Sequence, residues 1–188
     1  MRKILVFLVA SVDGYYEGPG GAFDWPVVDA EFNDFAVKQL DSADLMVFGR
    51  RTYEGMVAFW PTEEARTADP EVAIRMNGMA KIVASRTLES ADWENTRLVT
   101  DDIAGELATL KRQDGANIIV MGSSNLATEL LAAGLVDELR IMVMPIVLGG
   151  GKSLLHTVTG RVPVTLLDAK PFKSGNVLLT YAPGDVRR

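Results

Sequence analysis

The sequence predicts an α/β protein with a mainly parallel central sheet and an antiparallel edge formed by the C-terminal part of the chain. Three observations predict this class. Short apolar runs recur along the chain, segments with helical spacing lie between them, and the last strand-like segments follow one another without a helix. The chain has 188 residues, of which 48% are hydrophobic and 23% charged, so we expect a single domain over residues 1–188.

The first four expected strands are buried ones. Residues 4–9, 45–48, 82–84 and 118–121 are continuously apolar and too short for helices. Because side chains alternate between the two faces of a strand, a fully apolar run indicates a strand that is covered on both sides. This pattern is typical of parallel strands inside an α/β sheet.

The expected helices repeat apolar residues at intervals of three and four. Four segments do so, namely residues 32–40, 53–60, 103–110 and 126–131. Each has one apolar stripe that can pack on the sheet. Gly134 follows the last of them, where a left-handed residue commonly ends a helix. Residues 61–70 are polar with a proline at each end and are expected to form a loop.

The end of the chain has a different pattern. Apolar and other residues alternate along residues 139–144, and strand-like residues 164–167 and 177–181 follow without an intervening helix. We therefore expect an antiparallel pair of strands at one edge of the sheet.

Charge and composition exclude several classes of function. The chain has 19 Lys and Arg against 25 Asp and Glu, a net charge of −6, which argues against a nucleic-acid partner or an anionic membrane surface. It has no cysteine and one histidine, His156, so neither a disulfide framework nor a metal site is expected. No apolar run approaches the roughly 20 residues that span a bilayer. The apolar start is interpreted as a first strand rather than a signal peptide, and the protein is expected to be cytoplasmic.

Three strand ends carry residues suited to phosphate. They are Gly49-Arg50-Arg51-Thr52, Ser85-Arg86-Thr87 and Gly122-Ser123-Ser124-Asn125-Leu126. Open α/β sheets bind ligands at the carboxyl edge of their strands, and a helix N-terminus beside arginine suits an anion. Taken singly, such residues are more often N-caps, surface charges or a tight turn than a ligand site. Together, in an acidic protein, they predict a site for a phosphorylated dinucleotide.

These three segments are similar to those of the dihydrofolate reductase fold, which implies a three-layer α/β/α architecture. More closely, the chain resembles the reductase domain of the riboflavin-biosynthesis bifunctional deaminase/reductase and its stand-alone relatives. The further segments that carry this resemblance are Ser11-Val-Asp13-Gly14, Leu131-Ala-Ala-Gly-Leu-Val-Asp-Glu138 and Pro145-Ile-Val-Leu-Gly-Gly150. They occur in the right order over nearly the whole chain.

The resemblance implies an NADPH site. Arg50, Arg51 and Thr52, after Gly49, match positions that hold the cofactor's phosphates. Ser85 and Arg86, next to Thr87, match the side of the adenosine 2′-phosphate, which implies NADPH rather than NADH.

Two further segments complete the cofactor site that the resemblance implies. Residues 122–126 match the glycine-rich turn against the pyrophosphate, and Val9 and Ala10 match the backbone edge that meets the nicotinamide. One departure concerns Ser123, because dihydrofolate reductases have two consecutive glycines at this turn.

Candidates for the substrate side are less uniquely defined. Reducing a C=N or C=O bond requires a proton donor, and Asp29 and Glu31 are the candidate acids at the start of the first helix. An N-cap is the alternative role of Asp29, and a solvated first-turn acid that of Glu31. In the segment 11–26, Asp13, Gly14 and Trp25 are candidate substrate-binding residues; a tight turn and a core anchor are the alternatives.

The sequence thus predicts an NADPH-dependent reductase of a small heteroaromatic or imine/carbonyl substrate, similar to 5-amino-6-(5-phosphoribosylamino)uracil reductase. These 188 residues hold no counterpart of the deaminase half, so a role in that pathway is expected to need a separate deaminase. One alternative is a nucleotide- or ligand-binding module that lacks catalysis. Another is a structural homodimer, with the late strands and the 145–151 loop as the interface; a homodimer is also expected of the enzyme.

Overall fold

An eight-stranded sheet organises the part of the chain that the computed structural model describes, residues 1–184. The strand order is β5-β4-β3-β6-β1-β7-β10-β9. The strands are β1 (Ile4–Ser11), β3 (Ala43–Gly49), β4 (Ala80–Ala84), β5 (Thr96–Val99), β6 (Asn117–Met121), β7 (Glu138–Met144), β9 (Val164–Pro171) and β10 (Val177–Pro183). All pairs from β5 to β7 are parallel, whereas β10 is antiparallel to both β7 and β9. The predicted sheet with its antiparallel C-terminal edge is confirmed.

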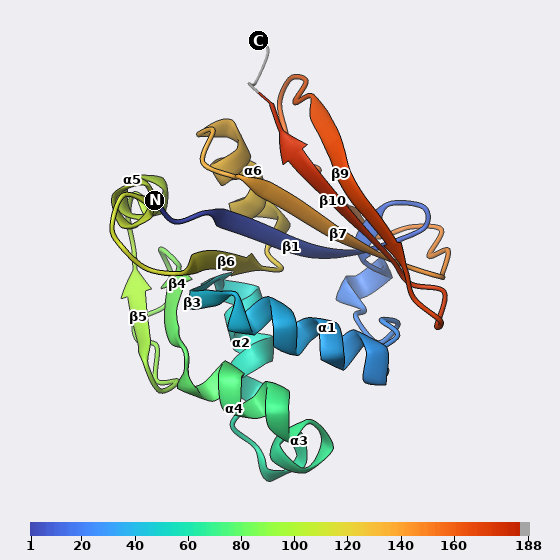
Figure 1. Cartoon of the computed structure of the whole chain (residues 1–188), viewed down its shortest axis with the longest axis horizontal. Coiled ribbons are helices and arrows are strands. Elements are labelled where there is room, and N and C mark those ends of the chain that lie inside the picture. Colours follow the sequence, from blue (N-terminus) through green and yellow to red (C-terminus); the bar gives the residue numbers. More distant parts are fainter. Residues whose placement is uncertain (185–188) are drawn as a thin grey trace.

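Helices cover both faces of the sheet, which gives three layers (Figure 1). One face carries α1 (Ala30–Asp41), α2 (Arg50–Phe59) and α4 (Pro70–Gly78), and the other carries α5 (Ile103–Lys111) and α6 (Ser124–Ala132). The pleat of β1 separates the two cores. Ile4, Val6 and Leu8 pack with α5 and α6, whereas Phe7 packs with residues of α1, α2 and α4. The predicted single domain extends to residues 185–188, which lie outside the described part.

Several elements were not expected from the sequence. Helix α3 (Glu63–Ala68) lies inside the predicted loop 61–70, and that prediction was wrong. Thr62 Oγ1 accepts a hydrogen bond from the Ala65 amide at 3.2 Å and caps this helix. Ala65 is its one buried residue, so α3 has no apolar stripe to detect. Helix α4 and the short strand β5 also escaped the periodicity argument.

A small second sheet forms beside the carboxyl end of β1. It pairs β2 (Tyr15–Glu17) with β8 (Lys152–Ser153), next to the 3-10 turn η1 (Pro19–Gly21). We call residues 11–17 and 146–155 together the clasp, because backbone hydrogen bonds join the two segments. Val12 N donates to Ile146 O at 2.8 Å, and Leu154 N donates to Gly14 O at 2.7 Å.

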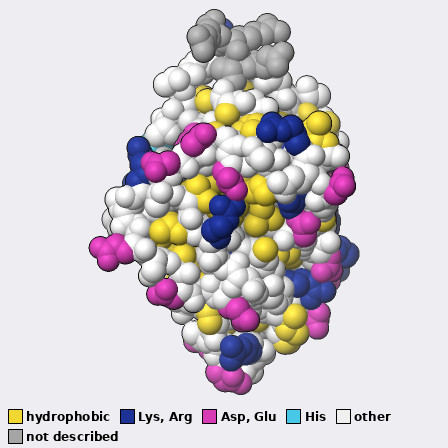
Figure 2. Space-filling model, turned by 90° about the vertical axis from the view of Figure 1, so that its left-hand side faces the viewer, with side chains coloured by type: hydrophobic (Ala, Val, Ile, Leu, Met, Phe, Trp, Pro, Cys, Tyr) yellow, Lys and Arg dark blue, Asp and Glu magenta, His cyan; other side chains and the backbone are white. Residues whose placement is uncertain are grey.

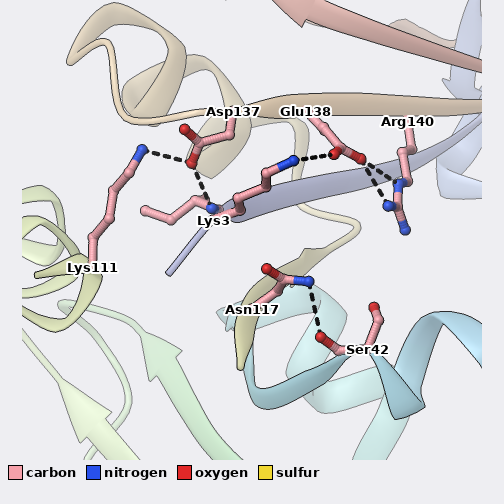
Figure 3. A network of polar contacts seen from close by, with 8 residues as sticks. Lys3, Ser42, Lys111, Asn117, Asp137, Glu138 and Arg140 are labelled. Atoms are coloured by element: carbon pink, nitrogen blue, oxygen red, sulfur yellow. Dashed lines mark hydrogen bonds and ion pairs between the residues drawn. The ribbon is translucent and has the colours of Figure 1, made fainter. Parts of the chain in front are cut away.

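The amino ends of β1 and β7 are fixed by a polar network (Figure 3). The Asp137 carboxylate accepts hydrogen bonds from the Ile4 amide at 2.7 Å and from Lys111 Nζ at 2.6 Å. Glu138 pairs with Arg140 at 2.8 Å. These contacts stabilise the side of the sheet where the amino ends of the strands lie. The carboxyl ends of the parallel strands lie on the opposite side.

The surface on the β5 and α5 side carries charged groups of both signs. Figure 2 shows Lys and Arg side chains interspersed with Asp and Glu and with small apolar areas. This face therefore presents no broad field of one sign. Within residues 1–184, none of the helices combines the length and hydrophobicity needed to cross a membrane.

Candidate functional site

A cleft of about 1340 Å³ lies at the carboxyl edge of the parallel strands. All three strand-end segments singled out in the sequence line it: Gly49 to Thr52 after β3, Ser85 to Thr87 after β4, and Gly122 to Leu126 after β6. Val9 of β1 lines it as well, whereas Ala10 is buried and pairs with Val143 of β7. The parallel sheet thus brings together segments that are far apart in the sequence.

Two helix N-termini meet in this cleft without side-chain caps. Helix α2 begins after Gly49 and α6 after Ser123, and neither residue makes a capping hydrogen bond through a side chain. By contrast, the N-caps of α1 and α5, Asp29 and Asp102, both accept one from the backbone. The first-turn N–H groups of α2 and α6 therefore remain available to an anionic ligand.

The two helix starts pack directly against each other. A Cβ atom at Gly49 would overlap Ser123 Oγ, and one at Gly122 would lie 2.9 Å from Thr52 Cγ2. Gly122 and Ser123 both have φ near +59°, in the left-handed region. Ser123, the departure from a double glycine, is therefore accommodated because Gly49 leaves room for its hydroxyl.

Arginines surround these helix starts. The side chains of Arg50 and Arg51 are 45% and 71% exposed. Arg50 pairs with Glu54 at 3.1 Å, and an Arg51 guanidinium nitrogen lies 3.7 Å from Glu17 Oε1. Because exposed ion pairs are weak, both guanidinium groups can exchange these partners for a ligand phosphate.

Lys152 of the clasp also holds Glu17, at 2.8 Å. Next to Glu17, Tyr16 lines the cleft and stacks on His156 with ring centroids 6.0 Å apart. Burial raises the pKa of the Tyr16 hydroxyl. The clasp thus reaches the cleft through Tyr16 and Glu17.

Two of the predicted hydroxyl groups are already committed within the protein. Ser85 Oγ accepts hydrogen bonds from the Thr87 amide at 3.2 Å and the Leu88 amide at 3.0 Å. Ser124 is buried, and its Oγ accepts from the Leu155 amide at 2.8 Å. These two hydroxyls stabilise the turn after β4 and the clasp. At these segments the groups left to contact a ligand are backbone amides and neighbouring side chains such as Arg86.

The cleft continues beyond β4 along residues that sequence reasoning missed. Thr100, Asp101 and Asp102 follow β5 and line the cleft. They were missed because β5 itself, four residues long and only partly buried, was not predicted.

The structure places Asp13 and Gly14 in the clasp and outside the cleft lining. The Asp13 carboxylate accepts hydrogen bonds from Ser11 Oγ at 2.7 Å and from the Leu148 and Gly149 amides at 3.0 and 2.7 Å. The Ser11 hydroxyl, followed by these amides, lowers the pKa of Asp13 to about 2. Gly14 has φ +82°, as a tight turn requires.

Asp29, Glu31 and Trp25 also lie outside the cleft lining. Asp29 is the N-cap of α1 and accepts from the Phe32 amide at 2.8 Å, while Glu31 accepts from the Lys173 amide at 2.9 Å. Trp25 Nε1 donates to Ala22 O at 3.2 Å. These contacts give the three side chains local structural roles.

Aromatic side chains form the part of the cleft farthest from the α2 N-terminus along that helix. Met56 and Phe59 of the second half of α2 and its C-cap Trp60 line the cleft, together with Phe7 of β1 and Phe23. The helical spacing had placed Met56 and Trp60 on a buried helix stripe. The sequence signal that could have indicated a cleft wall is Phe59, a large apolar residue that lies off the stripe. In the structure Phe59 is 37% exposed.

The described residues contain no group of three or more His, Cys, Asp or Glu side chains placed to hold a metal ion. The groups that line the cleft include backbone amides, arginines, aromatic rings and the carboxylates of Glu17, Asp101, Asp102 and Glu129.

Comparisons with known proteins identify the family of the chain. The family model described as the RibD C-terminal domain matches residues 2–178. The uncharacterized protein YyaP of Bacillus subtilis (strain 168) is 31% identical over 182 residues, which cover 96% of this chain and 94% of YyaP.

Two solved structures show the fold. A diaminohydroxyphosphoribosylaminopyrimidine deaminase/5-amino-6-(5-phosphoribosylamino)uracil reductase from Thermotoga maritima matches with a TM-score of 0.69 and 14% identity, over 97% of this chain and 57% of that chain. Dihydrofolate reductase from Enterococcus faecalis, complexed with NADP(H), matches with a TM-score of 0.62 and 17% identity, over 97% of both chains. The expected dihydrofolate reductase-like fold is confirmed.

Proposed function

Because the chain belongs to the RibD C-terminal domain family, a reductase domain, we propose that it is an NADPH-dependent reductase of a small heteroaromatic or imine/carbonyl substrate. The observation that carries this proposal is the meeting of two uncapped helix N-termini, those of α2 and α6, in one cleft beside Arg50 and Arg51. Such a pair of N-termini suits a ligand with two linked phosphates.

The phosphates and the nicotinamide of the cofactor would each meet a different part of the cleft. The pyrophosphate would be held by first-turn amides of α2 and α6 and by Arg50 and Arg51, and a 2′-phosphate by Arg86. The nicotinamide would lie against the backbone at the carboxyl end of β1, near Val9. Although the chain has a net charge of −6, Arg50, Arg51 and Arg86 place three cations after the carboxyl ends of β3 and β4, which supports an anion site there.

When bound, NADPH supplies the hydride that adds to the carbon of a C=N or C=O bond. The nitrogen or oxygen of that bond takes up a proton. Asp29 and Glu31 are engaged by the backbone of α1 and Lys173, so we assign this proton to water entering the open cleft. The chain's own residues bind and orient the two reactants.

Isothermal titration calorimetry, which measures the affinity of the protein for NADPH and separately for NADH, tests the proposal. Wild-type protein is expected to bind NADPH, and Arg50→Ala and Arg51→Ala to weaken binding about 10- to 100-fold each, because a charge-assisted hydrogen bond contributes about 1.5–3 kcal/mol. Arg75→Ala is the control, since Arg75 pairs with Asp41 and lies outside the cleft lining. If NADPH and NADH both fail to bind wild-type protein, the reductase proposal is wrong. Binding without turnover on any tested acceptor would favour the non-catalytic module.

A further inference from the structure

One wall of the cleft changes from cationic to aromatic along a single helix. Arg50 and Arg51 are at the start of α2, and Met56, Phe59 and Trp60 line the cleft from its second half and its C-cap. At 1.5 Å per residue, the nine steps from Arg51 to Trp60 correspond to about 13 Å along the helix axis. The two ends of this wall therefore contact different parts of any bound ligands.

The aromatic end offers ring surfaces and few polar groups. The Phe59 and Trp60 rings meet edge to face, with centroids 5.1 Å apart and an interplanar angle of 71°. The Trp60 indole N–H donates to Met56 Sδ at 3.1 Å, so its polar atom already has a partner. Phe23 and Phe59 are 58% and 37% exposed, which is unusual for large apolar side chains and leaves them accessible to a ligand.

No cation accompanies these rings. Among the described residues that line the cleft, the cations are Arg50, Arg51 and Arg86, and all three follow the carboxyl ends of β3 and β4. The negative end of the α2 dipole points toward Phe59 and Trp60. An anionic group seated there would face the negative end of this dipole and find no opposite charge beside it among the described residues that line the cleft, which is unfavourable.

We propose that the substrate is an uncharged, planar conjugated ring that stacks at the aromatic end, without a phosphate or carboxylate group. The proposal rests on the proposed function, in which NADPH supplies the hydride. The step balances when hydride adds to the carbon of a ring C=N or C=O bond, a proton adds to its nitrogen or oxygen, and NADPH leaves as NADP⁺. The arginines are then left to the cofactor, and substrate selection depends on Phe59 and Trp60.

Two matched pairs of ring compounds test this by isothermal titration in the presence of NADP⁺. The first pair is neutral 6-hydroxymethylpterin and anionic 6-carboxypterin, and the second is neutral menadione and anionic 1,4-naphthoquinone-2-sulfonate. We expect the neutral member of each pair to bind at least about tenfold more tightly. Phe59→Ala and Trp60→Ala are expected to weaken its binding about tenfold, the order measured for loss of a stacking partner.

Ile74→Ala is the matched control, because Ile74 is an exposed apolar residue of α4 outside the cleft lining. Phe59 is partly exposed, so its alanine variant should keep the wild-type fold, which circular dichroism checks. The inference is overturned if the anionic members bind as tightly as the neutral ones, if neither neutral ring binds, or if both alanine variants bind like wild type. If the ring compounds give one of these results while wild-type protein binds NADPH, only the substrate inference fails and the proposed function stands. If wild-type protein does not bind NADPH, the proposed function itself is wrong.

Discussion

Replacing Gly49 with alanine probes the contact that joins the two helix starts. Gly49 has φ −81°, which alanine adopts freely, so the backbone is not a source of strain. The added Cβ would overlap Ser123 Oγ and lie 3.0 Å from Ser123 Cβ. Overpacking of this kind costs about 1–3 kcal/mol. For a chain of this length, a loss of about 2 kcal/mol lowers Tm by about 4–8 °C.

The second substitution, Ser123→Gly, removes the atoms that clash. Ser123 lies in the left-handed region at φ +59° and makes no capping hydrogen bond through its side chain, so glycine is expected to change stability by less than about 1 kcal/mol. In that background, Gly49→Ala should cost little. A double-mutant cycle measured by urea unfolding is therefore expected to give a coupling energy of at least about 1 kcal/mol.

Gly55→Ala is the control on the same helix. A Cβ there meets no atom within 4 Å, and alanine in a helix interior is more stable than glycine by about 0.5–1 kcal/mol. If Gly49→Ala destabilises the Ser123→Gly protein as much as the wild type, Gly49 does not contact Ser123 as described.

Three further predictions concern other parts of the molecule. Asp13 has a folded pKa of about 2 against an ordinary 3.8, so it contributes stability above about pH 4 that is lost as the pH falls toward 2; urea unfolding should show a weaker acid dependence for Asp13→Asn, and an unchanged one would contradict the clasp. Burial lowers the pKa of Lys81 from 10.5 to about 8. Between these pH values the unfolded chain binds more protons than the folded one, so the free energy of unfolding should rise with pH. Lys81→Met should remove that rise, and its persistence would show another group to be responsible. We also propose that the protein is a homodimer through β9, whose residues are all exposed, with Leu166 and Leu167 at 52% and 55%; sedimentation should show a dimer that Leu166→Asp with Leu167→Asp converts to a monomer, and a monomeric wild type would refute it.

Hydrophobic patterning was sufficient for the parts of the fold that bury continuous apolar runs. The strands around Ile4, Val47 and Ile119 were predictable because both of their faces are covered. Helix α3 was not, because a cap at Thr62 and one buried residue, Ala65, leave no periodic signal. Strand β5, at the edge of the sheet, is partly exposed and gives an equally weak pattern.

The candidate site was predictable to the extent that topology alone positions it. Parallel strands end at one edge of the sheet, so residues such as Arg50, Arg86 and Asn125 could be grouped from the sequence alone. The roles of Asp13 and Ser124 depended on which backbone amides lie opposite them, and the amides concerned belong to the distant 146–155 segment of the clasp. Such long-range pairings leave no local pattern in a single sequence.

The central claim is that NADPH lies with its phosphates at the N-termini of α2 and α6. Backbone amide chemical shifts of isotope-labelled protein, followed during titration with NADPH, test it most directly. We predict the largest shifts at residues 50–52 and 123–126, where the uncapped N–H groups would meet the pyrophosphate. An absence of shifts, or shifts concentrated away from these two helix starts, would contradict this placement of the cofactor.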